Sequence, residues 1–421
     1  MRFGINTLDD FDLSGKTILV RVDMNQPVDR ERDCLKDTTR IKACVKTIGE
    51  IADAGAKTVL LAHQGADIEY QNFYTTRPHG KVLSGFLGRE VQFIDDVCGP
   101  AARDQIGKLQ EGDILLLDNV RFMAEEQTLF ELKLALTHEQ QAQTQVVQKL
   151  APLADLYVCD AFAAAHRDQP SLCGFEQLLP SAMGRLFEEE YCVISQLMEH
   201  PKRPCVFVLG GAKIADAFLM MSTVLDKAVA DVILTGGLVG QICTLASGKA
   251  LGKPTEDFIT KKGFGKYVQE AESILQRHPG KVALPLDFAW NADGARREID
   301  AGALPSDQPL ADIGAKTIAA YAERIMEAQT VFVNGPMGVF EDTPTQDGTK
   351  ALWEALGRTP AYTVIGGGDS VAAANLYGQA EKISYICTGG GALIRFLSGD
   401  ELPVVRALRE SAQKFNHRRC L

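Results

Sequence analysis

The sequence predicts an α/β protein built of two Rossmann-like domains, each with a parallel sheet. Three observations support this prediction. Short β-rich runs alternate with helical stretches along the chain. Polar residues directly follow several of these runs, which is where doubly wound sheets bind their ligands. The chain has 421 residues, more than one hydrophobic core usually serves, so two domains are expected.

The expected strands are short runs rich in branched aliphatic residues. In the first half they cover residues 17–24, 57–63, 91–95, 113–119 and 155–161. In the second half they cover 205–211, 231–237, 281–287, 330–335, 362–367 and 383–389. Helical stretches lie between them, for example 137–152 and 316–327, and segment 183–200 fits one long linking helix. We expect a first domain over 1–178 and a second over 179–403, with the tail at 404–421 packed back on the first.

Composition and charge narrow the class of protein. Hydrophobic residues make up 46% and charged residues 24% of the chain, which is typical of soluble globular proteins. No apolar run is long enough to span a bilayer, and the N-terminus lacks an export signal, so a cytoplasmic protein is expected. The ten cysteines are scattered without a CxxC pair, which favours reduced thiols. A net charge of −11 argues against nucleic acid as the main ligand.

Two glycine runs, GGGDSV at 366–371 and CTGGGA at 387–392, each follow a β-like stretch and precede a helix-like one. Glycines at such turns let backbone N–H groups approach an anion closely, and the helix N-terminus adds partial positive charge. Two such turns suggest a ligand with several phosphates. Asp369 lies inside the first run, where an acid needs a bridging cation, so we assign it to Mg²⁺. The alternative is two ordinary βα turns with a capping aspartate.

Other strand ends in the second half carry a lone basic residue, Lys213, and the turn NGPMGVFE at 334–341. A glutamate in that turn, Glu341, can accept hydrogen bonds from ribose hydroxyls. The alternative is a Pro/Gly turn without a ligand.

The strand ends of the first half have a different chemistry. They carry Asp23 and Asn25 together with basic residues, namely Arg21, Arg40, His63, Arg121, His166 and Arg167. Arginine forks suit carboxylate and phosphate oxygens, and Asp23 suits a substrate hydroxyl. This pattern predicts a pocket for a small anion that carries a hydroxyl. The alternative is that each arginine pairs with a surface acid.

These residues fall in motifs that occur together in one enzyme family. In order they are RVDMNQPVD (21–29), TRI (39–41), LLLDNVRF (115–122), DAFAAAHR (160–167), LGGAKIAD (209–216), LPLD (284–287), DIGAKT (312–317), NGPMGVFE (334–341), GGGDS (366–370) and TGGGA (388–392). The chain strongly resembles phosphoglycerate kinase over essentially its whole length. NGPMGVFE and LGGAK are the most specific motifs. The tail GGGALIRFLSGDELPVVRAL resembles the archaeal branch of the family.

The resemblance implies a reversible transfer in which 1,3-bisphosphoglycerate and MgADP give 3-phosphoglycerate and MgATP. It implies two domains joined by a hinge helix around an interdomain cleft, with the triose acid on the first domain and the adenine nucleotide on the second. A cytoplasmic monomer of glycolysis and gluconeogenesis is expected, with no nucleic-acid or membrane partner. Phosphoryl transfer of this kind needs positioning and charge neutralisation rather than covalent chemistry.

The resemblance also assigns residues by position. Arg40 and Lys213 match residues that contact the transferring phosphoryl group, and Asp369 matches the aspartate linked to Mg²⁺. The expected triose-acid site consists of Asp23, Asn25, His63, Arg121 and Arg167. The expected nucleotide site consists of Gly211, Asn334, Glu341, Gly366, Gly367, Gly368, Ser370, Gly389 and Gly390.

One departure from the family pattern bears on the substrate. Where the family reads HLGRP or HQSRP, this chain has HQGAD at 63–67, so Ala66 replaces a phosphate-binding arginine. Arg77 is a candidate replacement. Two alternatives therefore stay open: a kinase acting on a related carboxylate without the distal phosphate, and a catalytically silent nucleotide-binding paralogue. Retention of Arg40, Lys213 and Asp369 argues against the second.

Overall fold

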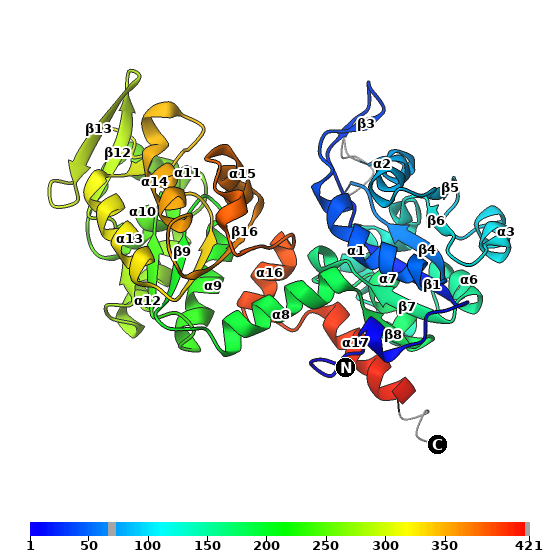
Figure 1. Ribbon diagram of the computed structural model, residues 1–421. Helices are drawn as coiled ribbons and strands as arrows, with labels where there is room; N and C mark the ends of the chain where they lie inside the picture. Colours follow the sequence, from blue (N-terminus) through cyan, green and yellow to red (C-terminus); the bar gives the residue numbers. More distant parts are fainter. Residues whose placement is uncertain (66–72, 417–421) are drawn as a thin grey trace. The chain divides into compact units, whose positions relative to one another are not determined.

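The computed structural model describes residues 1–65 and 73–416, and the chain divides into two units (Figure 1). Unit 1 comprises residues 1–192 together with the chain from Glu401 onward, and unit 2 comprises Val193–Asp400. The division falls inside helix α8 (Arg185–Glu199), whereas the sequence pattern suggested 178/179. Within the described ranges, no helix combines the length and the apolar character needed to cross a bilayer.

Unit 1 is built on a six-stranded parallel sheet with the order β5-β6-β4-β1-β7-β8. Its central strands are almost wholly buried, as expected for a parallel sheet covered on both faces. The strands are β1 (Thr17–Val22), β4 (Lys57–Ala62), β5 (Gln92–Ile94), β6 (Ile114–Leu117), β7 (Leu156–Cys159) and β8 (Ser181–Met183). A separate antiparallel pair joins β2 (Val28–Asp29) to β3 (Cys34–Leu35).

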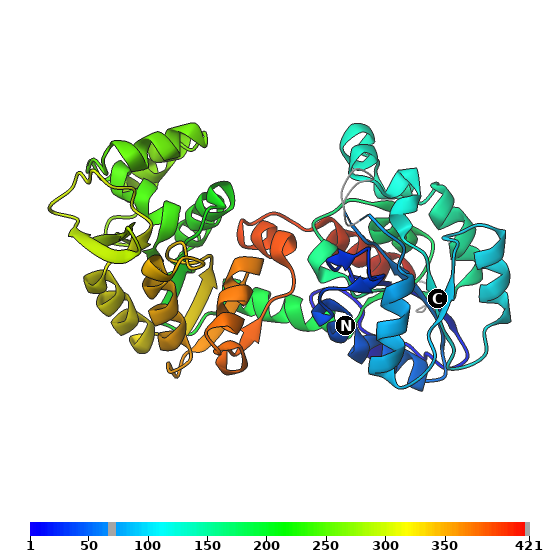
Figure 2. The ribbon, with the colours of Figure 1, turned by 90° about the horizontal axis from the view of Figure 1, so that it is seen from above.

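The helices of unit 1 follow from apolar periodicity. In α1 (Thr39–Asp53), Ile41, Cys44, Ile48 and Ile51 recur at spacings of three and four and form one buried face. The remaining helices are α2 (Arg77–Leu87), α3 (Pro100–Lys108), α4 (Thr128–Leu134), α5 (His138–Gln141), α6 (Gln145–Leu150), α7 (Pro170–Cys173) and α17 (Pro403–Asn416). Helix α17, drawn red, packs against α7 and β8 (Figures 1 and 2).

Unit 2 repeats the architecture with a second parallel sheet, ordered β11-β10-β9-β15-β16-β17. Its strands are β9 (Cys205–Leu209), β10 (Val232–Thr235), β11 (Val282–Ala283), β15 (Thr330–Asn334), β16 (Tyr362–Gly366) and β17 (Tyr385–Ile386). Its helices are α9 (Ile214–Asp226), α10 (Gly237–Ala246), α11 (Lys253–Lys261), α12 (Lys266–Arg277), α13 (Ala315–Glu327), α14 (Asp347–Leu356), α15 (Gly368–Leu376) and α16 (Gly390–Leu397). The predicted fold class, two Rossmann-like units with parallel sheets, is confirmed.

Besides the strands β2, β3 and β8, which were not predicted, the structure departs from the predicted elements in two places. The stretch 137–152 does not form one helix. It breaks into α5 and α6, because the Thr144 hydroxyl donates to the Gln141 carbonyl and ends the first turn. The second departure is an antiparallel sheet in which β12 (Asp287–Ala292) pairs with β13 (Ala295–Asp300) and β14 (Asp312–Ile313). A two-residue turn, Asp293-Gly294 with positive φ at both residues, joins β12 to β13.

Candidate active site

A small recess in unit 2 lies where three neighbouring strands end. Its lining comes from the turn after β9 (Gly210, Gly211, Ala212, Lys213), the turn after β15 (Asn334, Gly335) and the start of α15 (Gly367, Asp369, Ser370). Strands β9 and β15 are adjacent, and the strand order reverses between them. Ligands of doubly wound sheets bind at this switch point.

The glycines at the strand ends of unit 2 are of two kinds. Gly335 has φ +92°, and an added Cβ would lie 2.3 Å from the Gly210 carbonyl oxygen, so the close approach of the two turns requires it. Gly366 is also fixed by packing, against Leu393. At Gly368 and Gly390, in contrast, an added Cβ would meet no atom within 4 Å. Packing does not explain these two glycines, which begin α15 and α16 and leave the backbone open to a ligand.

The charged side chains of the recess have no partner among the described residues. Lys213, at the N-cap position of α9, and Asp369, in the first turn of α15, are exposed, and their side chains form neither a hydrogen bond nor an ion pair within the described ranges. Ser370 differs, because it is buried and its hydroxyl accepts from the Gly335 N–H at 2.8 Å. Gly367 approaches Asn334, whose Oδ1 would lie 2.6 Å from an added Cβ. Ser370 and Gly367 therefore shape the recess, and Lys213 and Asp369 are left to meet a ligand.

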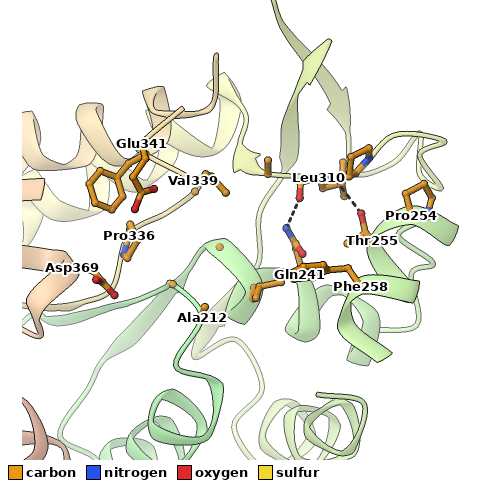
Figure 3. Close-up of a pocket in the computed structure, with 17 residues that line it drawn as sticks. Ala212, Gln241, Pro254, Thr255, Phe258, Leu310, Pro336, Val339, Glu341 and Asp369 are labelled. Carbon is orange, nitrogen blue, oxygen red and sulfur yellow. Dashed lines mark hydrogen bonds between the residues drawn. The ribbon is translucent and has the colours of Figure 1, made fainter. Parts of the chain in front are cut away.

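A largely apolar pocket of about 470 Å³ adjoins the recess and shares Gly211, Ala212 and Asp369 with it (Figure 3). Phe258 and Val339, which line it, are 46% and 50% exposed, unusual for such side chains. On one side lie Asp369, Pro336 and Glu341, and on the other lie Phe258, Thr255 and Leu310 (Figure 3). A pocket of this volume and character fits an aromatic base with its sugar.

Hydrogen bonds between helices and loops hold the far wall. The Gln241 amide donates to the Leu310 carbonyl at 3.0 Å, and the Leu310 N–H donates to the Thr255 hydroxyl at 3.0 Å (Figure 3). Sequence reasoning missed Gln241, Phe258 and Leu310, because they lie outside any motif. The signal in the sequence was slight, because Phe258 is one of two large apolar residues, with Ile259, on the largely polar helix α11.

The antiparallel sheet supports the near wall. Arg296 of β13 donates to Asp312 Oδ2 at 2.8 Å and to the Ile313 carbonyl at 2.7 Å. Asp312 also accepts from the Gly348 N–H at 2.8 Å. Burial raises the pKa of Asp312 to about 6, against the opposing effect of the Gly348 N–H and Arg296. The Val339 N–H donates to the Ala311 carbonyl at 2.9 Å, which ties the pocket loop to this support.

In unit 1, the predicted triose-site residues also follow strand ends, and most of them join one hydrogen-bonded network. Asp23 Oδ2 accepts from Arg40 at 2.9 Å, and Asp23 Oδ1 accepts from the Asn25 N–H at 3.0 Å. Asn25 Oδ1 accepts from the Gly65 N–H at 2.9 Å, and Arg121 donates to the Gly65 carbonyl. Burial raises the pKa of Asp23, but His63, the Arg40 guanidinium and the Asn25 N–H together outweigh burial and leave the pKa below its usual value.

His63 lies beside this network in neutral form. Burial, with Arg21 and Arg121 nearby, holds its pKa well below the usual value. The Arg21 guanidinium lies 3.2 Å from His63 Nδ1. Arginine can only donate, so Nδ1 accepts and Nε2 carries the proton. Sequence reasoning counted His63 as basic, but the structure makes it a neutral hydrogen-bond donor.

Three further arginines also contact neighbouring protein groups. Arg21 is almost fully buried and donates to the Ser171 hydroxyl at 2.9 Å and the Val22 carbonyl at 2.6 Å, so it holds the strand ends together. Arg167 pairs with Glu131 at 3.5 Å. Arg77 pairs with Asp95 at 3.4 Å, and its guanidinium lies 4.6 Å from the centre of the Phe93 ring. Ala66 lies outside the described residues.

Buried amides tie the network together, and sequence reasoning missed them as well. Gln64 Oε1 accepts from the Gln26 N–H at 3.0 Å, and Asn119 Oδ1 accepts from the N–H groups of Gln64 and Arg121, each at 3.0 Å. Gln64 follows His63 directly, and Asn119 lies within the LLLDNVRF motif. These amides connect the turns after β1, β4 and β6.

Comparison with known proteins agrees with this geometry. A sequence profile described as phosphoglycerate kinase matches residues 8–400. Proteins named phosphoglycerate kinase from Methanothermobacter thermautotrophicus and Methanobacterium bryantii are 43% and 45% identical to this chain over 409 and 408 residues. Each alignment covers 97% of this chain and 98% of the relative.

Solved structures give the same result. The crystal structure of phosphoglycerate kinase from Pyrococcus horikoshii OT3 matches with a TM-score of 0.87 at 39% identity, covering 97% of this chain and 100% of that one. The structure of phosphoglycerate kinase from Coxiella burnetii matches with a TM-score of 0.82 at 27% identity and the same coverage. The profile, the relatives and the structures confirm the resemblance seen in the motifs, and the chain belongs to the phosphoglycerate kinase family.

Proposed function

We propose that this chain transfers a phosphoryl group reversibly between 1,3-bisphosphoglycerate and ADP, giving 3-phosphoglycerate and ATP. Membership of the family supports the reaction. One observation supports placing the nucleotide on unit 2. The apolar pocket is continuous with the recess, because both are lined by Gly211, Ala212 and Asp369. A nucleotide has the same two-part chemistry, an apolar base joined to charged phosphates.

The adenine and ribose belong in the apolar pocket, and the phosphates belong in the recess. Glu341 has no hydrogen bond to the described residues and is free to accept from ribose hydroxyls. The phosphates meet the open backbone at Gly368, the N-terminus of α15 and the Lys213 ammonium. These contacts position the phosphoryl group and neutralise part of its charge.

Mg²⁺ fits the donor set at Asp369. Mg²⁺ in nucleotide sites uses one or two carboxylates together with phosphate oxygens and water. Asp369 offers one exposed carboxylate, without a protein partner among the described residues, at the mouth of the phosphate recess. A bound Mg²⁺ supplies neutralisation of phosphate charge.

Unit 1 binds the triose acid. The His63 Nε2–H, Arg121 and Arg167 supply donors for its anionic groups, and Asp23 and Asn25 face its hydroxyl. Arg40 pairs with Asp23 at 2.9 Å. Together with Lys213, Arg40 stabilises charge on the phosphoryl group. The acceptor carboxylate is already ionised at neutral pH, so the reaction needs no general base.

Ala66 favours a second candidate, transfer to a related carboxylate that lacks the distal phosphate. A coupled assay with MgATP separates the two when 3-phosphoglycerate and glycerate are compared side by side. We expect turnover with 3-phosphoglycerate and a far lower kcat/KM with glycerate. The reverse ranking would favour the second candidate, and activity with neither acid would contradict both. A cytoplasmic location and a monomeric state stay predictions.

A further inference from the structure

A mostly buried cluster of potential metal ligands lies in unit 1, outside the network around Asp23. His138 of α5, Asp168 and Cys173 of α7 each offer one ligand atom, and the three atoms all lie within 4.8 Å of one another. We propose that this cluster is a Zn²⁺ site that fastens helix α17 to unit 1. Imidazole, thiolate and carboxylate together are the ligand types that Zn²⁺ selects.

The orientation of His138 supports the proposal. Its Nδ1 lies 2.9 Å from Glu410 Oε2 of α17. An ionised carboxylate only accepts, so Nδ1 carries the proton and Nε2 keeps its lone pair. Nε2 lies 3.6 Å from Asp168 Oδ1 and 3.4 Å from the Arg406 guanidinium. A carboxylate that holds the far nitrogen of a metal-binding histidine is a recurrent arrangement in zinc sites.

The distance between His138 Nε2 and Asp168 Oδ1 also fits a shared ion. At 3.6 Å it is too long for a hydrogen bond. Two ligand atoms bound at ~2.1 Å to one tetrahedral ion stand ~3.4 Å apart. Gln141, almost fully buried, donates to Asp168 Oδ1 at 2.5 Å and fixes the carboxylate in place.

Cys173 supplies the third ligand, and its thiol is weakly held. Its Sγ lies 3.8 Å from the Arg167 carbonyl, and its side chain is fully buried. Zn²⁺ binds the thiolate, so binding releases the thiol proton to solvent and forms a Zn–S bond. Water or the second oxygen of Asp168 completes four-coordination. Asp168 is 34% exposed, which gives the ion an entry path.

Arg406 of α17 competes with the proposed Zn²⁺ for contacts with His138 and Asp168. It lies 3.4 Å from His138 Nε2 and 3.8 Å from Asp168 Oδ2. Both contacts are long, and the side chain is 50% exposed. Arg406 therefore balances the charge of Asp168 without the metal and swings outward when Zn²⁺ binds.

The cluster joins segments far apart in the sequence. His138 lies in α5, Cys173 lies in α7, and Glu410 of α17 holds His138. Asp168 is the neighbour of Arg167, a predicted triose-acid residue. Bound Zn²⁺ fastens α17 and steadies the segment that carries Arg167.

Co²⁺ is the probe for the test, because its thiolate complexes absorb light and those of Zn²⁺ do not. The full chain carries Cys34→Ser throughout, since Cys34 is exposed and would bind metal adventitiously. We expect one Co²⁺ per chain, with a thiolate charge-transfer band that is lost in Cys173→Ser and His138→Gln. Cys243→Ser, which removes a buried thiol of unit 2, is the matched control and keeps the band. Glu410→Gln weakens metal affinity by about 10-fold or more.

Thermal unfolding is the second measurement. Zn²⁺ raises the Tm of the parent chain and not that of Cys173→Ser, while both chains have native circular dichroism without metal. A Co²⁺ band that survives in Cys173→Ser, or no binding of Co²⁺ by the parent chain, would overturn the proposal. Neither readout uses kinase activity, so the outcome is independent of the proposed reaction.

Discussion

The two predicted halves of the active site hold their charges in opposite ways. In unit 1, Asp23 pairs with Arg40, and Arg121 donates to the Gly65 carbonyl. In unit 2, Lys213 and Asp369 form no ion pair with the described residues. The unit 1 network is thus held in shape by its own hydrogen bonds, whereas the charges of the unit 2 recess would be neutralised by the proposed nucleotide phosphates and Mg²⁺. Changes in unit 1 should cost stability as well as activity, and changes in the recess should cost activity alone.

The largest expected effect tests this difference directly. Lys213→Ala and Arg40→Ala should each lower kcat about 10²–10³-fold, because each removes a charge that we propose to stabilise the phosphoryl group. Only Arg40→Ala should destabilise the fold, by about 1–3 kcal/mol, since it leaves the buried Asp23 carboxylate without its partner. Steady-state kinetics and urea unfolding measure the two effects.

The tryptophans provide the control for these variants. Both lie in unit 2, at Trp290 and Trp353, so their fluorescence reports unit 2 only. Arg40→Ala should shift the unfolding midpoint seen by circular dichroism and leave the fluorescence midpoint in place. Near-native turnover of Lys213→Ala would contradict its proposed role at the phosphoryl group. Equal loss of stability in both variants would contradict the difference between the two units.

Buried acids sharpen the comparison, because Asp160 of unit 1 has no ion pair with the described residues, whereas Asp312 of unit 2 pairs with Arg296. Burial raises the pKa of Asp160 to about 7, and its Oδ2 has no hydrogen-bond partner among the described residues. The folded chain therefore binds the proton more tightly than the unfolded chain, and stability falls as pH rises from about 4 to about 7. Asp160→Asn keeps an acceptor for the Leu186 and Phe187 N–H groups and should remove this loss, roughly 2–4 kcal/mol at higher pH.

Asp312 of unit 2 is the matched comparison for Asp160. Its pKa of about 6 lies closer to the usual value, and Arg296 donates to it at 2.8 Å. Asp312→Asn should gain less at high pH than Asp160→Asn, because it also loses the attraction to Arg296. Unfolding free energies at several pH values measure both. A flat pH profile for the parent chain would contradict the assignment to Asp160.

The prediction for Mg²⁺ concerns a smaller effect, on the affinity for ATP, whose sign depends on whether Mg²⁺ is present. Asp369→Asn should weaken MgATP by about tenfold, or ~1.4 kcal/mol, and leave 3-phosphoglycerate affinity unchanged. Without Mg²⁺, the same variant should bind ATP slightly better, because a like charge beside the phosphates is gone. Titration calorimetry with and without Mg²⁺ measures both. Equal weakening of the two ligands would point to a capping role for Asp369.

The smallest effect concerns Arg77, the candidate replacement for the arginine absent at Ala66. Its contacts with Asp95 and Phe93 engage it elsewhere on the surface. Arg77→Ala should therefore change the KM for 3-phosphoglycerate by no more than about twofold. A large rise in that KM, with the KM for MgATP unchanged, would show that Arg77 does bind the distal phosphate.

Sequence reasoning found the sheets and strand ends but not the walls of the pocket. Strand ends are local features, so Asp23, His63, Lys213 and Asp369 were visible as residues that follow apolar runs. Gln241, Phe258 and Leu310 meet only through tertiary packing and lie outside any motif. The neutral form of His63 was also hidden, because burial and neighbouring arginines set it.

The antiparallel sheet was likewise not predicted from the sequence. The residues of β12 and β13 have no apolar alternation that distinguishes a strand, and only the Asp293-Gly294 turn signalled a hairpin. The hairpin holds Asp312 through Arg296, and these two residues are sixteen positions apart in the sequence. Local pattern predicts such an element poorly.

Because α17 completes unit 1 but follows unit 2 in the chain, the ribosome finishes unit 1 last. About two hundred residues of unit 2 separate α8 from α17, which at ordinary elongation rates takes roughly 10–40 s. Until then, the surface that Val404, Val405 and Leu408 cover stays open to solvent. Unit 2 is contiguous and can fold as soon as it emerges. The nascent first half therefore waits with uncovered apolar surface, in the interval when chaperones have most to bind.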